Sequence, residues 1–421
     1  MRIKKYTLAL MFVALAGPLL DLLTGYSLLI LNISSLLTPG VIYRGFVLVP
    51  VFVLLTFHTR THIRLVVFYF AFVFFLAIGV HYVLGYEVNI GQGVQRYLKM
   101  LLPILGLGAL LFLHNKYPKS RSEQVVWGIG GAYGLVVALS IVGFFLTGSG
   151  LQTYRLVRYS SAAVFDDQNA VGIVLVLSLP MLLYYLYRFK HVSMIVLLTV
   201  EGLWLFSAFL LATRMAIIGV PTTILLFHLF IFFNRRHNRN IQQALYKFIL
   251  LAGILLIGIL IYQFWAQQDV QRIFYKFELL SRGEFRRRVP DGIAIISQFS
   301  VLEHLFGIGD AAFALTENDL VDIYGKFGLA VLIPLLLFYL SFYSGVLLAF
   351  LKKRSLATFV LLICFTFYIF HAVVAGHALA NAQVNNLFIF SYFLAYKEIV
   401  ADRSSVPLVT ETESTSAPLA V

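Results

Sequence analysis

Residues 168–187 read QNAVGIVLVLSLPMLLYYLY, a run of 20 residues without a charged side chain. An α-helix rises 1.5 Å per residue, so such a run spans about 30 Å, the thickness of a bilayer's hydrocarbon core. At least ten segments of the chain have this character. Strands of a transmembrane barrel would instead alternate apolar and polar residues. The stretch therefore predicts one of many membrane-spanning helices.

The composition of the whole chain also indicates a membrane protein. Of 421 residues, 60% are hydrophobic and only 12% are charged, and the mean hydropathy is +0.89. A water-soluble protein of this composition would have too little polar surface to cover itself. We therefore expect the chain to fold within a bilayer.

The expected fold class is an all-α integral membrane protein with about 12 transmembrane helices and one large periplasmic or extracellular loop that contains amphipathic helices. Helices one to nine fill residues 1–265, the large loop covers 266–326, helices ten to twelve fill 327–397, and 398–421 form a cytoplasmic tail. The tail is rich in Ser, Thr and Glu and is expected to be disordered. The predicted spans are 6–29, 40–57, 65–85, 98–114, 124–147, 168–187, 192–211, 215–233, 247–265, 327–350, 356–375 and 382–397.

The first span overlaps a segment that resembles a secretory signal. Met1–Asp21 has a basic start and an apolar centre, and Ala14-Leu15-Ala16 is a candidate cleavage site. The apolar run continues to about Ile30, which favours an uncleaved first helix.

The net charge of +13 follows the positive-inside rule if the N-terminus is cytoplasmic. Every loop then predicted to lie inside the cell is basic. Both termini are cytoplasmic in this topology, and the expected location is the bacterial cytoplasmic (inner) membrane. Because topology accounts for the basic excess, no nucleic-acid binding is expected.

Several classes of site are excluded by what the sequence lacks. Cys364 is the only cysteine and lies in an apolar span, which excludes disulfides, zinc ribbons and iron–sulfur clusters. The chain has no Walker phosphate loop and no dinucleotide-binding fingerprint, which argues against ATP-driven transport by this chain alone.

Arginines on the predicted outer side depart from the positive-inside rule, which favours basic residues in the cytoplasmic loops. They gather in the loops at about 148–167 and 266–326 and at the edge of one span: Arg155, Arg158, Arg214, Arg272, Arg282, Arg286, Arg287 and Arg288. A role beyond topology is therefore expected for this group.

The large loop contains two apolar patterns of helical period. Residues 269–280 carry Val270, Ile273, Phe274, Phe277 and Leu280 between charged residues, which predicts an amphipathic helix on the outer membrane face. A second stripe is formed by Ile293, Ile296, Phe299, Leu302 and Leu305 and ends at Gly307-Ile308-Gly309.

The second half of the loop combines three guanidinium groups with acids. Arg286-Arg287-Arg288 precedes Thr316-Glu317-Asn318-Asp319 by about thirty residues. Arginine suits a diphosphate because its planar fork donates paired hydrogen bonds and keeps its charge. An acid nearby can deprotonate a hydroxyl nucleophile. Together they predict transfer from a lipid diphosphate to an alcohol, with arginines in the place of a divalent metal.

Each half of this pattern also has a structural interpretation. Thr316 is a good N-cap, with Asp319 near the positive end of the helix that follows. The arginine run is also what a patch that attracts anionic lipid headgroups requires. Glu317 and Asp319 form a possible Mg²⁺ pair, but no Asp-x-Asp occurs elsewhere to support a metal.

Other polar residues leave alternatives open. Glu201 lies near the middle of span 192–211, and suits either a transporter site or a protonated side chain bonded to a neighbour. Asp166, Asp167 and Asn169 lie at the start of span 168–187, where helix capping is the favoured role. His228, His371 and His377 lack a convincing metal spacing, so neither a metal nor another cofactor is expected.

The order of these motifs resembles the O-antigen polymerase and ligase superfamily of bacterial membrane glycosyltransferases. The resemblance covers the chain from about the sixth span to the twelfth. Its matching pieces are Phe165-Asp166-Asp167-Gln168-Asn169, Thr213-Arg214-Met215-Ala216, Arg288, Leu305-Phe306-Gly307-Ile308-Gly309, Glu317-Asn318-Asp319 and Gly376-His377. Ligases of the family carry a His-Asn pair where this chain has Glu317-Asn318, and this departure favours the polymerase branch.

The resemblance implies a GT-C-like enzyme that moves an undecaprenyl diphosphate-linked glycan onto an acceptor sugar, without a metal and with inversion at the anomeric carbon. By position, Arg214 and Arg288 would hold the diphosphate, and Glu317 would orient or deprotonate the attacking hydroxyl. The helix N-terminus at Glu317 lowers a carboxyl pKa and weakens it as a base unless burial offsets this effect. Further residues expected to bind substrate are Arg286, Arg287, Asn318, Asp319, His377 and Arg158.

Three functions remain, and the polymerase is preferred. The first is a polymerase of undecaprenyl diphosphate-linked oligosaccharides, for O-antigen, capsule or exopolysaccharide. The second is a flippase of the same lipid-linked material, and the third is a ligase that uses another acceptor. The expected partners are the lipid-linked substrate and membrane lipid, with a chain-length regulator and a flippase as candidate protein partners.

Overall fold

The structure, a computed structural model, describes residues 17–28, 31, 38–58, 62–116, 122–148, 163, 165, 167–233, 288–309, 312–313, 316, 318–374 and 378–404. Every regular element within these ranges is a helix. Nine helical runs among them are long and apolar enough to cross a membrane. The predicted class, an all-α integral membrane protein, is confirmed.

The nine runs agree with nine of the predicted spans. They are α2 (Pro39–Ile42), η2 (Tyr43–Leu48) and α3 (Val49–Phe57) as one run, α4 (Ile63–Val83), α5 (Ile90–Lys116), α6 (Ser122–Thr147), α7 (Gln168–Tyr185) with η3 (Leu186–Lys190), α8 (Met194–Leu211), α9 (Arg214–Phe233), α14 (Asp319–Lys353) and α15 (Leu356–Val374). The η elements are short π-helical stretches that continue the helices beside them.

Three further predicted spans have a different status. Residues 17–28 of the first are helical, and the last corresponds to α16 (Ala382–Ser404), which continues beyond the predicted end at 397. The predicted span 247–265, the amphipathic helix at 269–280 and residues 405–421 lie outside the described residues. The total of twelve spans stays a prediction.

Helix α7 lies in the middle of the bundle. Its side chains from Ala170 to Tyr184 are buried, and it packs against α6, α9, α15 and α16. Glycines make the close approach of α6 possible, since a Cβ on Gly134 would lie 1.7 Å from Ser178 Oγ. Small residues at helix contacts let backbones approach closely in membrane proteins. Helix α7 is thus the rigid centre around which the other helix ends are placed.

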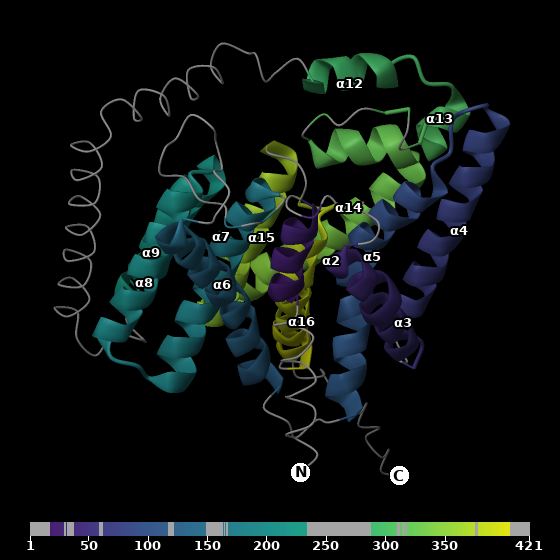
Figure 1. Ribbon diagram of the computed structural model, residues 1–421. Coiled ribbons are helices and arrows are strands. Elements are labelled where there is room, and N and C mark those ends of the chain that lie inside the picture. The colour runs from purple at the N-terminus through teal and green to yellow at the C-terminus, as the bar shows by residue number, and fades with distance from the viewer. Residues whose placement is uncertain are drawn as a thin grey trace, which may run out of the picture.

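One end of the bundle carries two short helices, α12 (Arg288–Ile296) and α13 (Val301–Phe306). In Figure 1 they lie at the top, with α12 across the start of α14 and α13 beside the end of α4. We call this end the loop face; it comprises α12, α13, the start of α14, the end of α15 and the start of α16.

The predicted apolar stripe does not run along one helix. A capping box between Ser300 and Glu303 starts α13 as a new helix after α12 has ended. Ile296 is buried in a small cluster with Ile308 and Phe313, whereas Leu302 and Leu305 are exposed. The prediction of one continuous apolar stripe was therefore wrong: the helix ends before Ser300, and Ile293 is exposed as well.

Helix α14 is bent where the Gly307-Ile308-Gly309 segment docks against it. Gly328 has φ 69° and ψ −174° inside the helix, a combination that is essentially restricted to glycine. The backbone N–H of Ile308 donates to Gly325 O at 2.9 Å, and that of Gly309 donates to Lys326 O at 3.1 Å. The bend separates an outer segment of α14 from the part that spans the membrane.

Substituting Gly328 by alanine is expected to destabilise the protein by at least about 2 kcal/mol. Alanine is strained in this backbone conformation, and its Cβ would also collide with the backbone of Leu305. A Cβ at this position would lie 2.2 Å from Leu305 O. Thermal unfolding of the purified protein in detergent measures the effect. Gly202→Ala is the matched control, since a Cβ there meets no atom within 4 Å. Equal unfolding midpoints for the two variants would show that the bend does not depend on Gly328.

Candidate functional site

The start of α14 is fixed to the end of α15 by Asn318. The Asn318 side-chain oxygen accepts hydrogen bonds from the backbone N–H groups of Leu320 at 3.0 Å and Val321 at 3.2 Å. Its amide nitrogen donates to Val373 O at 2.8 Å. Asn318 thus caps one helix and joins it to another.

Asp319 makes a second connection, on the other side of the same segment. Its carboxylate is 1% exposed, and Oδ2 accepts a hydrogen bond from the backbone N–H of Leu379 at 2.7 Å. Val373 and Leu379 flank residues 375–377. The chain at 318–319 is therefore bonded to both flanks of the segment that contains Gly376-His377.

Helix α12 is held against the same place. A Cβ on Gly292 would lie 2.5 Å from Thr316 Cγ2 and 3.2 Å from Val321 Cγ1, so the Gly292 backbone packs directly against these two side chains. Thr316 is fixed in turn by Asp322, whose Oδ1 accepts from the Thr316 backbone N–H at 2.7 Å and its hydroxyl at 2.8 Å. Arg288 precedes Gly292 by four residues, about 6 Å along a helix.

The described residues that neighbour Arg288, Glu317 and His377 in the chain therefore lie close together in the structure. Glu317 follows Thr316, which contacts α12, and precedes Asn318, which bonds α15. Consecutive Cα atoms lie about 3.8 Å apart, so covalent geometry limits how far Glu317 can be from both contacts. Glu317, Arg286, Arg287, His377 and Arg158, and the side chain of Arg288, lie outside the described residues. Their roles stay predictions.

Arg214 is placed by the tight connection between α8 and α9. Ala212 takes a left-handed conformation with φ 55°, and the Thr213 hydroxyl accepts from the Ala216 backbone N–H at 3.3 Å. A Cβ on Gly172 would lie 2.5 Å from Thr213 Oγ1. This contact sets Arg214, the first residue of α9, near the N-terminal end of α7.

The residue that caps α7 is bonded to the residue that caps α16. Asp167 caps α7 by accepting from the Ala170 backbone N–H at 3.0 Å, which confirms the predicted capping role. Its other oxygen accepts from Asn381 Nδ2 at 2.9 Å. Asn381 in turn caps α16, with its oxygen 2.8 Å from Gln383 N. Arg214 and the 318–319 segment are thereby connected through helices that begin or end at the loop face.

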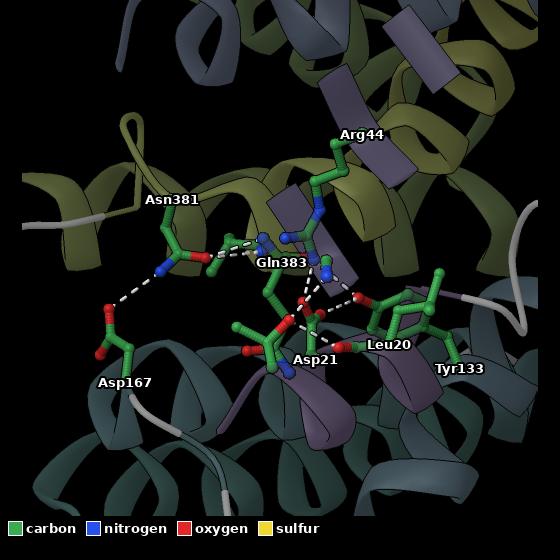
Figure 2. A network of polar contacts seen from close by, with 10 residues as sticks. Leu20, Asp21, Arg44, Tyr133, Asp167, Asn381 and Gln383 are labelled. Carbon is green, nitrogen blue, oxygen red and sulfur yellow. Dashed lines mark hydrogen bonds and ion pairs between the residues drawn. The ribbon is translucent and has the colours of Figure 1, made fainter. Parts of the chain in front are cut away.

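A polar network continues from this point into the bundle (Figure 2). The Tyr133 hydroxyl on α6 donates to Gln383 O at 3.3 Å and contacts Asp21 Oδ2 at 3.4 Å. Asp21 also forms an ion pair with Arg44, which comes from η2. The network joins residues 17–28, η2, α6, α7 and α16, and so supports the loop face from below.

Replacing Arg44 by alanine is expected to destabilise the protein by about 3–5 kcal/mol, because it leaves the Asp21 carboxylate without its cation in a buried position. The Arg44 and Asp21 side chains are only 14% and 10% exposed. Unfolding in detergent measures the loss. The double variant Arg44→Ala/Asp21→Ala is the control, and it is expected to lose less, since no uncompensated charge remains. A double variant as unstable as the sum of the two single variants would contradict this account.

The intramembrane acid Glu201 is paired. Its Oε1 lies 2.7 Å from Nε2 of His228, which joins α8 to α9. Both side chains are buried. Of the two alternatives for Glu201, this geometry favours a side chain bonded to its neighbour. Within the described ranges, no group of three or more His, Cys, Asp or Glu side chains is placed to hold a metal ion. A reaction without a metal stays a prediction.

Asp21, Arg44 and Asn381 are among the members of this arrangement that were not predicted from the sequence. Asp21 and Arg44 are each the only charged residue within a predicted span, 6–29 and 40–57. A buried charge in a membrane needs a partner, so these two were recognisable as a pair. Asn381 has the weaker signal of a capping residue type just before an apolar run.

Comparison with known proteins gives one family. A family model described as "O-antigen ligase like membrane protein" matches residues 3–284 of the chain. A search of curated proteins found no match.

Proposed function

The chain belongs to the family of O-antigen ligase like membrane proteins, and we propose that it is a glycosyltransferase of the polymerase kind. It joins oligosaccharide repeat units that are carried on undecaprenyl diphosphate, at the outer face of the cytoplasmic membrane. The product is an O-antigen, a capsule or an exopolysaccharide.

One observation carries this proposal more than any other. The described neighbours of Arg288, Glu317 and His377 meet at the loop face, through the Gly292 contact with Thr316 and the bonds from Asn318 and Asp319 to Val373 and Leu379. This convergence of their neighbours supports the proposal that Arg288 offers a cation for a diphosphate and Glu317 an acid for a hydroxyl at the same end of the protein. This combination suits group transfer from a lipid diphosphate to a hydroxyl at a membrane surface.

The proposed reaction is a direct displacement. A hydroxyl oxygen of the acceptor glycan attacks the anomeric carbon of the donor glycan, and a new C–O bond forms as the bond to the phosphate oxygen breaks. The electron pair leaves with the lipid diphosphate, whose charge Arg288 and Arg214 stabilise. Glu317 accepts the hydroxyl proton. A single displacement inverts the anomeric configuration, and no metal takes part.

Asn318 and Asp319 have a revised role in this proposal. Their described hydrogen bonds go to the protein backbone, so both hold the geometry of the Glu317 segment. We therefore propose that they position the site, and that Arg286, Arg287, Arg158 and His377 are the residues that contact the glycan or diphosphate.

The ligase is the second candidate, favoured by the wording of the family description. The two reactions share the donor and differ in the acceptor, which is a second repeat unit for the polymerase and a different glycolipid for the ligase. Glu317 in the place of the ligases' histidine is the observation that favours the polymerase. The flippase fits less well, because Asp21, Arg44 and Glu201, three charged residues within the helix bundle, are bonded to one another or to a neighbour.

A gel of surface polysaccharide tests the proposal. Cells that lack the chain are complemented with the wild type or with Glu317→Ala. We expect single repeat units on the surface without the wild type, and a ladder of polymer with it. Lipid-linked units without any surface sugar would contradict the polymerase and favour the ligase or the flippase.

A further inference from the structure

Helix α4 presents a continuous apolar face to its surroundings. Leu65, Phe68, Phe72, Phe75 and Tyr82 recur at helical spacing, and each is more than half exposed. Because α4 is long and apolar enough to cross a membrane, we expect this exposed apolar face to contact lipid. Its 21 residues span about 30 Å, so its last turn lies at the edge of the hydrocarbon core. Tyr82 in that turn is the residue type that favours the membrane interface.

Helix α13 is bonded to that last turn of α4. His81 Nε2 lies 2.9 Å from Phe306 O and 3.1 Å from Gly307 O. The Tyr86 hydroxyl, just beyond α4, donates a hydrogen bond to the Glu303 carboxylate. This bond raises the pKa of Tyr86 to about 12 and lowers that of Glu303. The depth of α13 in the membrane is therefore set by the end of α4.

The two sides of α13 differ in character. Glu303 bonds Tyr86, and His304 Nδ1 lies 2.7 Å from the Tyr324 hydroxyl on α14. Val301, Leu302 and Leu305 are 77%, 46% and 42% exposed. An amphipathic helix at the edge of the hydrocarbon core places such apolar side chains among the acyl chains.

We propose that α13 is an interfacial helix whose Val301, Leu302 and Leu305 insert into the lipid leaflet at the loop face, beside Tyr82 and Val83 of α4. The occupant of this surface is lipid acyl chain. Three side chains are too few for a stable protein interface of ordinary size, which needs about 20 residues a side. Insertion into lipid has no such minimum, because each side chain adds its own apolar area.

Anchoring of α13 has a consequence for the site. The segment after α13, Ile308 and Gly309, is bonded to the backbone of α14 at Gly325 and Lys326. The start of α14 is therefore held at the level of the lipid headgroups, where a lipid diphosphate lies. Only this consequence rests on the proposed function; the insertion of α13 does not.

The experiment uses the single cysteine of the chain. Cys364 is buried, and Cys364→Ala gives a background without a reactive thiol. Leu302→Cys and Leu305→Cys place an environment-sensitive fluorophore on the apolar side of α13. Gln298→Cys is the matched control, since Gln298 is exposed in the turn between α12 and α13. The full chain is reconstituted at low density in phosphatidylcholine and phosphatidylglycerol vesicles, with or without nitroxide-labelled lipid.

We expect nitroxide lipid to quench the labels at 302 and 305 severalfold more than the label at 298, and aqueous iodide to show the reverse order. Equal quenching at all three positions would overturn the proposal. Protection of the labels at 302 and 305 from both quenchers would also overturn it, because a protein would then cover the surface. Fluorescence does not depend on catalysis, so this result stands apart from the polysaccharide assay.

Discussion

Arg288→Ala is expected to abolish glycan polymer while the amount of protein in the membrane stays unchanged. In the proposed reaction the guanidinium neutralises the diphosphate as it leaves, and loss of one such donor slows a reaction by about 10²–10³-fold. Arg288 is the first residue of α12, which lies against Thr316 through Gly292. The surface polysaccharide ladder measures the effect, with immunoblotting of the membrane fraction for protein level.

Two further variants make this prediction specific. Arg288→Lys is also expected to be impaired, because a point charge does not replace the paired hydrogen bonds of a guanidinium. Arg188→Ala removes an equal charge from η3, at the opposite end of α7 from the loop face, and is expected to leave the ladder intact. Full activity of Arg288→Lys would reduce the role of Arg288 to bulk charge.

Glu317→Ala is the second variant expected to lose all polymer. The side chain is proposed to take the proton of the attacking hydroxyl, and general base catalysis contributes about 10²–10⁴-fold to a rate. Its neighbours are fixed, since Thr316 is bonded to Asp322 and Asn318 to Val373. The same ladder assay reports the loss.

Asn318→Ala separates this chemical role from a structural one. It removes the cap of α14 and the bond to α15, so it is expected to lower the unfolding midpoint as well as the yield of polymer. Glu317→Ala is expected to lower polymer alone. Near-normal polymer from Glu317→Ala would remove Glu317 from the mechanism.

The fold was predictable from sequence to the extent that it depends on apolar length. The runs at 168–187 and 356–375 correspond to α7 with η3 and to α15 because a bilayer tolerates only helices with internally satisfied backbones. The bend at Gly328 was not predictable in this way. It depends on a backbone contact with Leu305, more than twenty residues away in the chain, and periodicity carries no information about such contacts.

The sequence predicted which residue types form the candidate site better than it predicted the hydrogen bonds that hold them in place. The Thr316–Asp319 segment was correctly predicted to start a helix, but Thr316 is not its N-cap: Asn318 caps α14, and the Thr316 hydroxyl donates to Asp322 instead. Sequence alone did not show that the Asn318 side chain donates a hydrogen bond to Val373 O, or that the Asp319 carboxylate accepts one from the Leu379 backbone N–H. The pairing of Asp21 with Arg44 required only the rule that intramembrane charges find partners. The break between α12 and α13 depends on the Ser300 capping box. It was not predicted because the regular spacing of apolar residues continues across it.

The most direct test of the central claim is polymerisation by the purified chain. The protein is reconstituted in vesicles with one undecaprenyl diphosphate-linked repeat unit as the sole glycan, with and without a chelator, and the lipid-linked products are separated by length. We predict products of two or more repeat units and release of undecaprenyl diphosphate, with the chelator having no effect and Arg288→Ala making no product. A repeat unit that stays single until a different acceptor glycolipid is added would contradict the polymerase and identify a ligase.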